Sequence, residues 1–329
     1  MQKRISLVAI VLALVVLLVG NSSLFAQVVT DCLDCHNDTT VITGKKTGWS
    51  ESMHGTGEAY VRGTSASCAA CHSGGGFSAM VAAGLTPETI EAGDPNPTRQ
   101  DCRACHQVHT SYTVADWALE TTDPVALYAL EGAIYDGGKG NLCANCHQPR
   151  RVIAAADPNG NIAVTSTHWG PHHGPQSAMM LGIGGGGDVA GFPGAHSVLV
   201  RNTCVTCHIG KDNRHTFEPD VSACVTCHSD AEDFDIDGVQ TEVEALIVQL
   251  RDLLVAKGLL AEETEYEIGD DGVIEEVVAG YHPVVGVYPA AQASALWNYI
   301  FIAIEDGSLG VHNPGYTKAL LEAAIEALQ

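Results

Sequence analysis

The feature that most constrains this chain is a five-residue pattern, Cys-x-x-Cys-His, which occurs six times. Together the six copies use all 12 cysteines of the 329 residues, so no cysteine remains for another purpose. The cysteine pairs are Cys32 and Cys35, Cys68 and Cys71, Cys102 and Cys105, Cys143 and Cys146, Cys204 and Cys207, and Cys224 and Cys227. The histidines that close the motifs are His36, His72, His106, His147, His208 and His228.

This pattern is the attachment signature of c-type haem. The two thiols add to the vinyl groups on one edge of the porphyrin, and the adjoining histidine supplies the proximal imidazole. A zinc site would pair two such units around one metal and would not need a histidine after every second cysteine. A disulfide framework has no use for that histidine, and a thioredoxin-like redox pair would occur only once. The motifs therefore predict six covalently bound haem c groups.

Nine further histidines are available for the opposite faces of these irons, whereas methionine is scarce. We expect bis-histidine ligation and low-potential haems, because a methionine ligand would raise the potential. The expected distal ligands are His54, His109, His168, His172, His196 and His215. Two of the three histidines in THWGPHHGP are expected to bind iron, and the choice between His172 and His173 stays open. His282 and His312 rank below these candidates.

Residues 1–26 resemble a secretory signal peptide, with Lys3 and Arg4 before an apolar run and cleavage expected after Ala26. A retained membrane anchor is the alternative, since the run approaches spanning length. No other stretch of the sequence looks able to span a membrane. We expect a periplasmic or secreted, extracellular protein.

The haem density shapes the expected fold. Roughly one haem for 33 residues leaves little room for a conventional protein core, so the haems themselves should form it. We expect a mainly α multihaem cytochrome c fold with extensive loops over residues 27–230, with short helices at the motifs and almost no sheet. Residues 231–329 should form an acidic helical domain without haem.

Helical periodicity in this tail predicts helices over residues 239–258 and 290–305, and a third that begins near Asn313 and Pro314. Residues 262–285 should form a loop or a hairpin around Asp271-Gly272. The stretch DFDIDGVQTEVE matches the spacing of a calcium loop, although an acidic segment leading into a helix explains the same letters. The simpler interpretation is that these helices pack on one another and on the haem layer. The alternative is that they form a homodimer interface.

The chain is strongly acidic, with a formal net charge of −23. Residues 229–329 contain 20 acidic and 3 basic residues, which accounts for −17 of that charge. Such a balance argues against binding nucleic acid or anionic lipid. It favours docking to basic patches on partner proteins, such as a quinol oxidase, other cytochromes or a terminal reductase.

The whole chain resembles a family of secreted hexahaem c-type cytochromes from anaerobic and sediment bacteria. The stretches that carry this resemblance are WSESMHG, CAACHSGGGF, CRACHQVH, GNLCANCHQPR, STHWGPHHGP, NRHTFEP and EDGSLGVHNPGY. A more distant similarity links the chain to pentahaem nitrite reductases and octahaem reductases. Those nitrite reductases have a catalytic haem whose motif ends in lysine, whereas every motif here ends in histidine. This departure puts an active site of that type in doubt.

The expected function is electron transfer through closely spaced bis-histidine haems in anaerobic respiration, with no catalytic residue of its own. The first alternative is a reductase of nitrite, hydroxylamine or a sulfur oxyanion, which would need one open haem. The second alternative is an extracellular cytochrome filament, in which His312 would ligate a haem of the next subunit.

Overall fold

Five of the six motifs lie within the part of the chain that the structure describes, and each is on a short helix. The structure is a computed structural model that describes the backbone of residues 40–268 and 274–329, and the side chains of residues 42–264 and 280–329. The predicted signal peptide, the first motif and the Asp271-Gly272 turn lie outside the described residues. The five motif helices are α4 (Ala66–His72), α6 (Cys102–Cys105), α7 (Asn141–Ala144), α10 (Thr203–His208) and the 3₁₀ turn η5 (Val221–Thr226).

Local side-chain caps explain where several of these helices begin. The Asp101 carboxylate accepts a hydrogen bond from Arg103 N at the start of α6, and Asp220 accepts one from Ser222 N at the start of η5. Such caps satisfy backbone donors that have no partner within the helix.

The other elements of this half are α2 (Thr40–Glu51), α3 (Met53–Thr56), η2 (Ala59–Thr64), α5 (Gly74–Ala82), η3 (Val114–Trp117), β1 (Val125–Ala126), β2 (Ile134–Tyr135), η4 (Gly138–Gly140), β3 (Asn161–Val164), α8 (Gln176–Leu181) and α9 (Ala195–Leu199).

The tail contains the long elements of the protein. After the turn η6 (Ile236–Gly238) come α11 (Val239–Ala256), α12 (Ala290–Tyr299) with its π-helical continuation η7 (Ile300–Asp306), and α13 (Pro314–Leu328). These match the three predicted helices, and Asn313 caps α13 by accepting from Tyr316 N. Residues 260–268 (β4) and 274–283 (β5) form an antiparallel hairpin, one of the two predicted alternatives for this segment. None of the helices in the described ranges is long and apolar enough to cross a bilayer.

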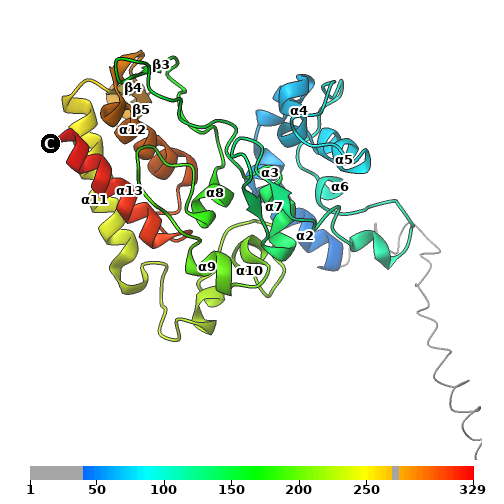
Figure 1. Ribbon diagram of the computed structural model, residues 1–329. Helices are drawn as coiled ribbons and strands as arrows, with labels where there is room; N and C mark the ends of the chain where they lie inside the picture. The colour runs from blue at the N-terminus through cyan, green and yellow to red at the C-terminus, as the bar shows by residue number, and fades with distance from the viewer. Residues whose placement is uncertain (1–39, 269–273) are drawn as a thin grey trace, which may run out of the picture.

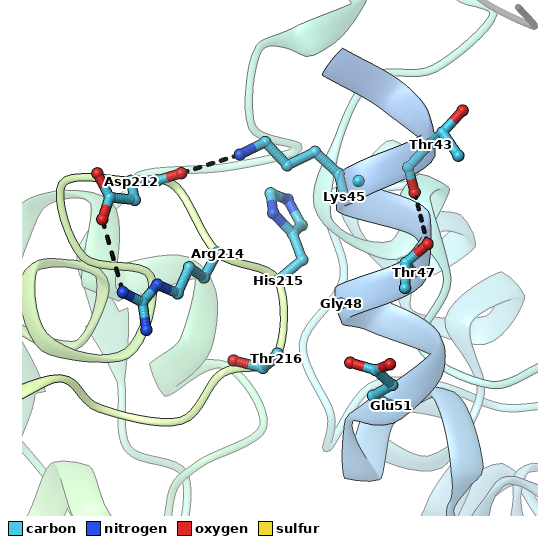
Figure 2. A pocket seen from close by; sticks show the side chains of 10 residues that line it. Thr43, Lys45, Thr47, Gly48, Glu51, Asp212, Arg214, His215 and Thr216 are labelled. Carbon is cyan, nitrogen blue, oxygen red and sulfur yellow. Dashed lines mark hydrogen bonds and ion pairs between the residues drawn. The ribbon is translucent and has the colours of Figure 1, made fainter. Parts of the chain in front are cut away.

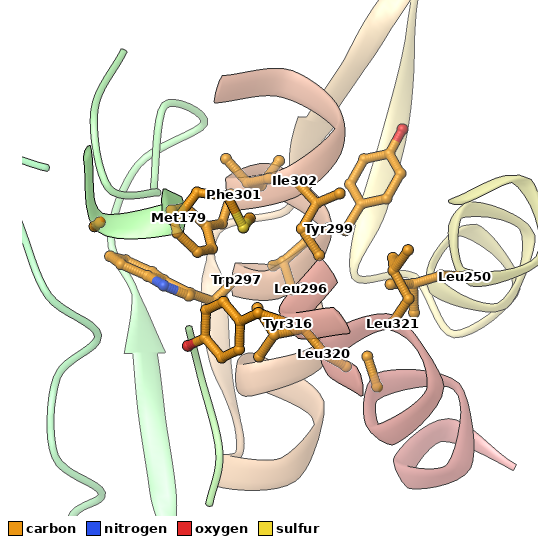
Figure 3. Close-up of a cluster of buried hydrophobic side chains, with 14 of the residues drawn as sticks. Met179, Leu250, Leu296, Trp297, Tyr299, Phe301, Ile302, Tyr316, Leu320 and Leu321 are labelled. Carbon is orange, nitrogen blue, oxygen red and sulfur yellow. The ribbon is translucent and has the colours of Figure 1, made fainter. Parts of the chain in front are cut away.

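The main hydrophobic core lies where the three tail helices meet (Figure 3). Leu250, Leu296, Phe301 and Leu320 are fully buried there. The core also takes in Met179 and other residues from the motif-bearing half. In Figure 1 the tail helices lie on one side, α4, α5 and α6 on the other, and α7 to α10 between them.

The motif-bearing half and the tail are therefore joined rather than separate. Strand β3 pairs with β6 (Gly286–Pro289) in an antiparallel sheet that crosses the expected boundary at residue 230. The Trp297 indole N–H donates to Gly184 O at 2.9 Å, and Asn298 Oδ1 accepts from Gly186 N at 2.6 Å. The boundary thus separates residues with motifs from residues without them, but one core serves both.

Candidate functional site

Each of the five described motif histidines faces another histidine across a gap. The ring centroids lie 6.1 to 6.4 Å apart in all five pairs. The pairs, motif histidine first, are His72 with His172, His106 with His215, His147 with His54, His208 with His312, and His228 with His196. Metal–imidazole bonds are about 2.0–2.1 Å long, so two nitrogens on opposite sides of one metal lie about 4 Å apart. Adding the two ring radii gives the separation observed, which is the spacing that bis-histidine ligation requires.

The ring nitrogens are oriented for the same purpose. In six of these rings Nδ1 lies within hydrogen-bond distance of an oxygen, which leaves Nε2 available for a metal. The bonds are His106 to Trp117 O, His147 to Gln176 Oε1, His196 to Val311 O, His208 to Phe217 O, His215 to Asn213 O and His312 to Asp306 Oδ1. A hydrogen bond of this kind fixes the tautomer and the ring orientation of a metal-ligating histidine.

The protonation of these rings also suits ligation, because a metal binds the neutral imidazole. Burial and the nearby His147 lower the pKa of His54 to about 4. Burial and the neighbouring His173 lower the pKa of His172 to about 4. His312 differs, because the Asp306 carboxylate outweighs burial and raises its pKa. That carboxylate is 2.7 Å from Nδ1, so it holds a proton on the nitrogen that faces away from His208.

One cavity brings together every attachment point that a single haem needs. It has a volume of about 380 Å³ and is lined by Cys68, Cys71, His72 and His172, among other residues. Arg150 also lines it and is the cation available to a propionate there. The thiols, the proximal imidazole and the distal imidazole of the second motif therefore surround one space, which fits haem c.

A second cavity lies beside His215, between α2 and residues 212–216 (Figure 2). Its volume is about 510 Å³, and Lys45 and Arg214 are among its lining residues. Lys45 Nζ donates to Asp212 O at 3.0 Å, and Arg214 forms an ion pair with Asp220 at 3.0 Å. These bonds hold cationic side chains next to the ring that faces His106.

Exposed apolar residues occur close to three of the paired histidines, in the sequence or in the fold. Met53, next to His54, is 80% exposed, and Leu199, three residues after His196, is 77% exposed. Trp117 is also exposed, and its ring lies edge-on to His106. Apolar surface of this kind is stabilised when it is covered, and a porphyrin between the paired rings would cover it.

The remaining candidate histidines differ in whether a described motif histidine lies opposite them. No described motif histidine lies opposite His168, whose ring lies 5.8 Å from that of His282; because His36 lies outside the described residues, the assignment of His168 as an iron ligand stays a prediction. His172, not His173, faces the second motif: its left-handed backbone (φ 73°) turns the chain, and His173 bonds to Glu305 instead. His312, ranked low from the sequence, faces His208. The sequence signal that could have raised its rank is Asp306, six residues earlier, whose carboxylate accepts from His312 Nδ1.

His109 is held in a tight turn. The Asp116 carboxylate accepts from the backbone N–H groups of His109, Ser111 and Tyr112, and the His109 ring stacks on that of Tyr112. Because His36 lies outside the described residues, the assignment of His109 as an iron ligand stays a prediction.

Residues 233–244, which match the spacing of a calcium loop, lead into helix α11. Asp235 accepts hydrogen bonds from the N–H and the hydroxyl of Thr241, in the first turn of α11. The Thr241 hydroxyl also lowers the pKa of Asp235 below its usual value. Among the described residues, no group of three or more His, Cys, Asp or Glu side chains is arranged to hold a metal ion. Nothing at this segment therefore adds to the calcium hypothesis.

In comparisons with known proteins, no family model, no curated protein and no solved structure matches this chain.

Proposed function

We propose that this chain is an electron carrier that holds six haem c groups, each between a motif histidine and a second histidine. The observation that carries the proposal is the set of five histidine pairs at 6.1 to 6.4 Å. Haem c supplies one-electron redox chemistry when bound, and its potential depends on the axial ligands. With histidine on both faces, the protein leaves no coordination position for a substrate at these five motifs.

The paired residues act by holding their positions. Carbonyl and carboxylate oxygens fix the rings, so oxidation or reduction requires little movement of the protein. Each transfer moves one electron: a reduced donor protein is oxidised and the chain is reduced, with no atom exchanged. The acidic surface would steer basic partner proteins toward the carrier in a salt-dependent way.

The geometry weighs against both alternatives. A reductase needs an iron with one open face, and each described motif histidine has a second histidine opposite it. A filament that uses His312 to ligate the next subunit is disfavoured, because His312 faces His208 of its own chain. We propose residence outside the cytoplasm, consistent with the leader-like residues 1–26; a homodimer through the tail helices has no specific support.

The test is an anaerobic reductive titration of the purified holoprotein, followed by two assays. The carrier should take up six electrons per chain, matching its six motifs, and return them to a ferric cytochrome acceptor. With reduced viologen as donor, it should not turn over nitrite, hydroxylamine or sulfite above the rate of free haem. Turnover of any of these substrates would refute the proposal.

A further inference from the structure

Thiols from different motifs meet in this fold, and the second and fourth motifs provide the first case. The thiols of Cys71 and Cys146 lie close enough to interact with each other. Cys146 Sγ lies 3.7 Å from Ala70 O, and Cys71 Sγ lies 3.9 Å from Asn145 O. Helices α4 and α7, about 70 residues apart in the chain, therefore touch at their second cysteines.

The fourth and fifth motifs meet at their first cysteines. The thiols of Cys143 and Cys204 lie close enough to interact with each other, and Cys204 Sγ lies 3.9 Å from Gly140 O. The approach depends on glycine, since a Cβ on Gly140 would lie 2.0 Å from Thr203 Oγ1 and 3.2 Å from Cys204 Sγ. Tyr135 secures the contact, because its hydroxyl donates to Thr203 Oγ1 at 2.9 Å.

The third and sixth motifs complete the arrangement. A small core of buried side chains, which includes Ala70, Ala104 and Leu142, has Cys71, Cys105 and Cys146 packed against it. The third motif therefore converges with the second and fourth. The sixth motif follows the fifth after a short loop, and α10 contacts η5 directly.

We propose that the fourth motif, Cys143–His147, is the junction of the electron route: it joins the second and third motifs to the fifth, and the fifth leads to the sixth. This inference rests on the proposed function. With haem c bound, each motif thiol would be joined to the porphyrin edge through a single carbon, so neighbouring thiols of two motifs would bring two porphyrin edges together. Electron exchange between two such sites oxidises one and reduces the other, and moves no atom.

The first experiment raises the potential of the junction site in the holoprotein. His54 faces His147, so His54→Met replaces the distal imidazole of this site by a thioether, which raises the potential. The haem of the fourth motif should then have the highest potential and be reduced first in a redox titration. Its added negative charge should lower the midpoint potentials of the neighbouring haems. NMR of the shifted haem methyl resonances reports each midpoint separately. We expect downward shifts at the second, third and fifth motifs.

The matched variant is His196→Met, which makes the same change at the sixth motif. There we expect a downward shift at the fifth motif and at no other described site. The proposal is overturned if His54→Met shifts no more sites than His196→Met does, or if it shifts the sixth motif most.

A second variant tests the contact between the fourth and fifth motifs without changing a ligand. Gly140→Ala introduces the Cβ clash described above and should push α10 away from α7, while all six haems remain attached. Reduction of either haem, at the fourth or the fifth motif, should then lower the midpoint potential of the other by less than it does in wild type. Gly315→Ala is the control, because a Cβ added to that exposed glycine would meet no neighbouring atom within 4 Å. An unchanged effect of one haem on the other in Gly140→Ala would refute the junction.

The two proposals fail differently. Turnover of nitrite would refute the carrier function and leave the order of the sites intact. Midpoint potentials that do not respond to the change at the fourth motif would refute the junction and leave the carrier function intact.

Discussion

Replacing His312 by alanine should open one iron of the six, and replacing His168 should open none. Sequence context ranked these histidines in the opposite order, so the comparison separates the geometry from the pattern. In the structure His312 faces His208 at 6.4 Å, whereas His168 faces His282. Loss of the His312 imidazole should convert one sixth of the haem from six-coordinate low-spin to five-coordinate high-spin iron.

The same substitution has a second effect that can be worked out from the contacts. The Asp306 side chain is 1% exposed and accepts from His312 Nδ1, from the Ser308 hydroxyl and from Ser308 N. His312→Ala removes the first of these donors, and leaving a buried acceptor short of a partner costs about 1–3 kcal/mol. His168→Ala removes an exposed ring and should change stability by less than about 0.5 kcal/mol.

Low-temperature EPR and optical spectra of the two oxidised variants provide the assay, with cyanide added afterwards. In His312→Ala we expect a high-spin signal from one haem per chain, which cyanide converts to low-spin. In His168→Ala every haem should remain low-spin. A fully low-spin His312→Ala protein would refute the pairing of His312 with His208. A high-spin haem in His168→Ala would refute the expectation that His168 is not an iron ligand.

Three further substitutions test other parts of the account. Leu250 is fully buried in the tail core, so Leu250→Ala should lower the free energy of unfolding by about 2.7–5 kcal/mol, measured by denaturant titration; a loss below about 1 kcal/mol would contradict the packing shown in Figure 3. Asp306→Asn should raise the midpoint potential of the fifth motif, because the neutral amide makes His312 a less basic ligand; an unchanged potential in a redox titration would argue against this orienting bond. Hydrogen bonds led by that from the Ser111 hydroxyl lower the pKa of Asp116, so its carboxylate stabilises the fold above the unfolded pKa of about 3.9. This contribution is lost as the pH falls through the lower folded value. Asp116→Asn should therefore melt below wild type at pH 7, and the difference in melting temperature should narrow as the pH falls below the unfolded pKa of about 3.9; a difference that does not change with pH would contradict the charge-based explanation.

The tail helices could be predicted because their signals are local. The apolar stripe of α11 and the Asn313 cap of α13 are readable within a few turns. The motif histidines, which we expect to be the proximal ligands, are equally local signals, since each follows its cysteines directly. The hairpin of β4 and β5 could only be left as one of two alternatives, because its turn residues allow a loop as well.

The distal ligands could be named as candidates from the sequence but not paired with their motifs. His208 and His312 are more than 100 residues apart, and only the packing of α10 against the tail brings them together. His168 and His172 lie in one short stretch, and only the fold shows that His172 is the one that faces the second motif. The strand pairing of β3 with β6, which merges the two expected domains, is similarly non-local.

These pairings have a consequence for folding. A haem held between His208 and His312 would tie α10 to the tail, and one between His147 and His54 would tie the fourth motif to α3. Binding free energy at such a site becomes folding free energy, because both ligands come from distant segments. The small cores between the motifs would then be supplemented by the haems themselves.

The most direct test of the central claim is the spin state of the unmodified, oxidised holoprotein before and after addition of cyanide or nitrite. We predict six low-spin haems and no change with either ligand, because the proposal places a histidine on both faces of each iron. A high-spin haem that responds to nitrite would contradict it and would make the chain a reductase whose other haems feed one open site.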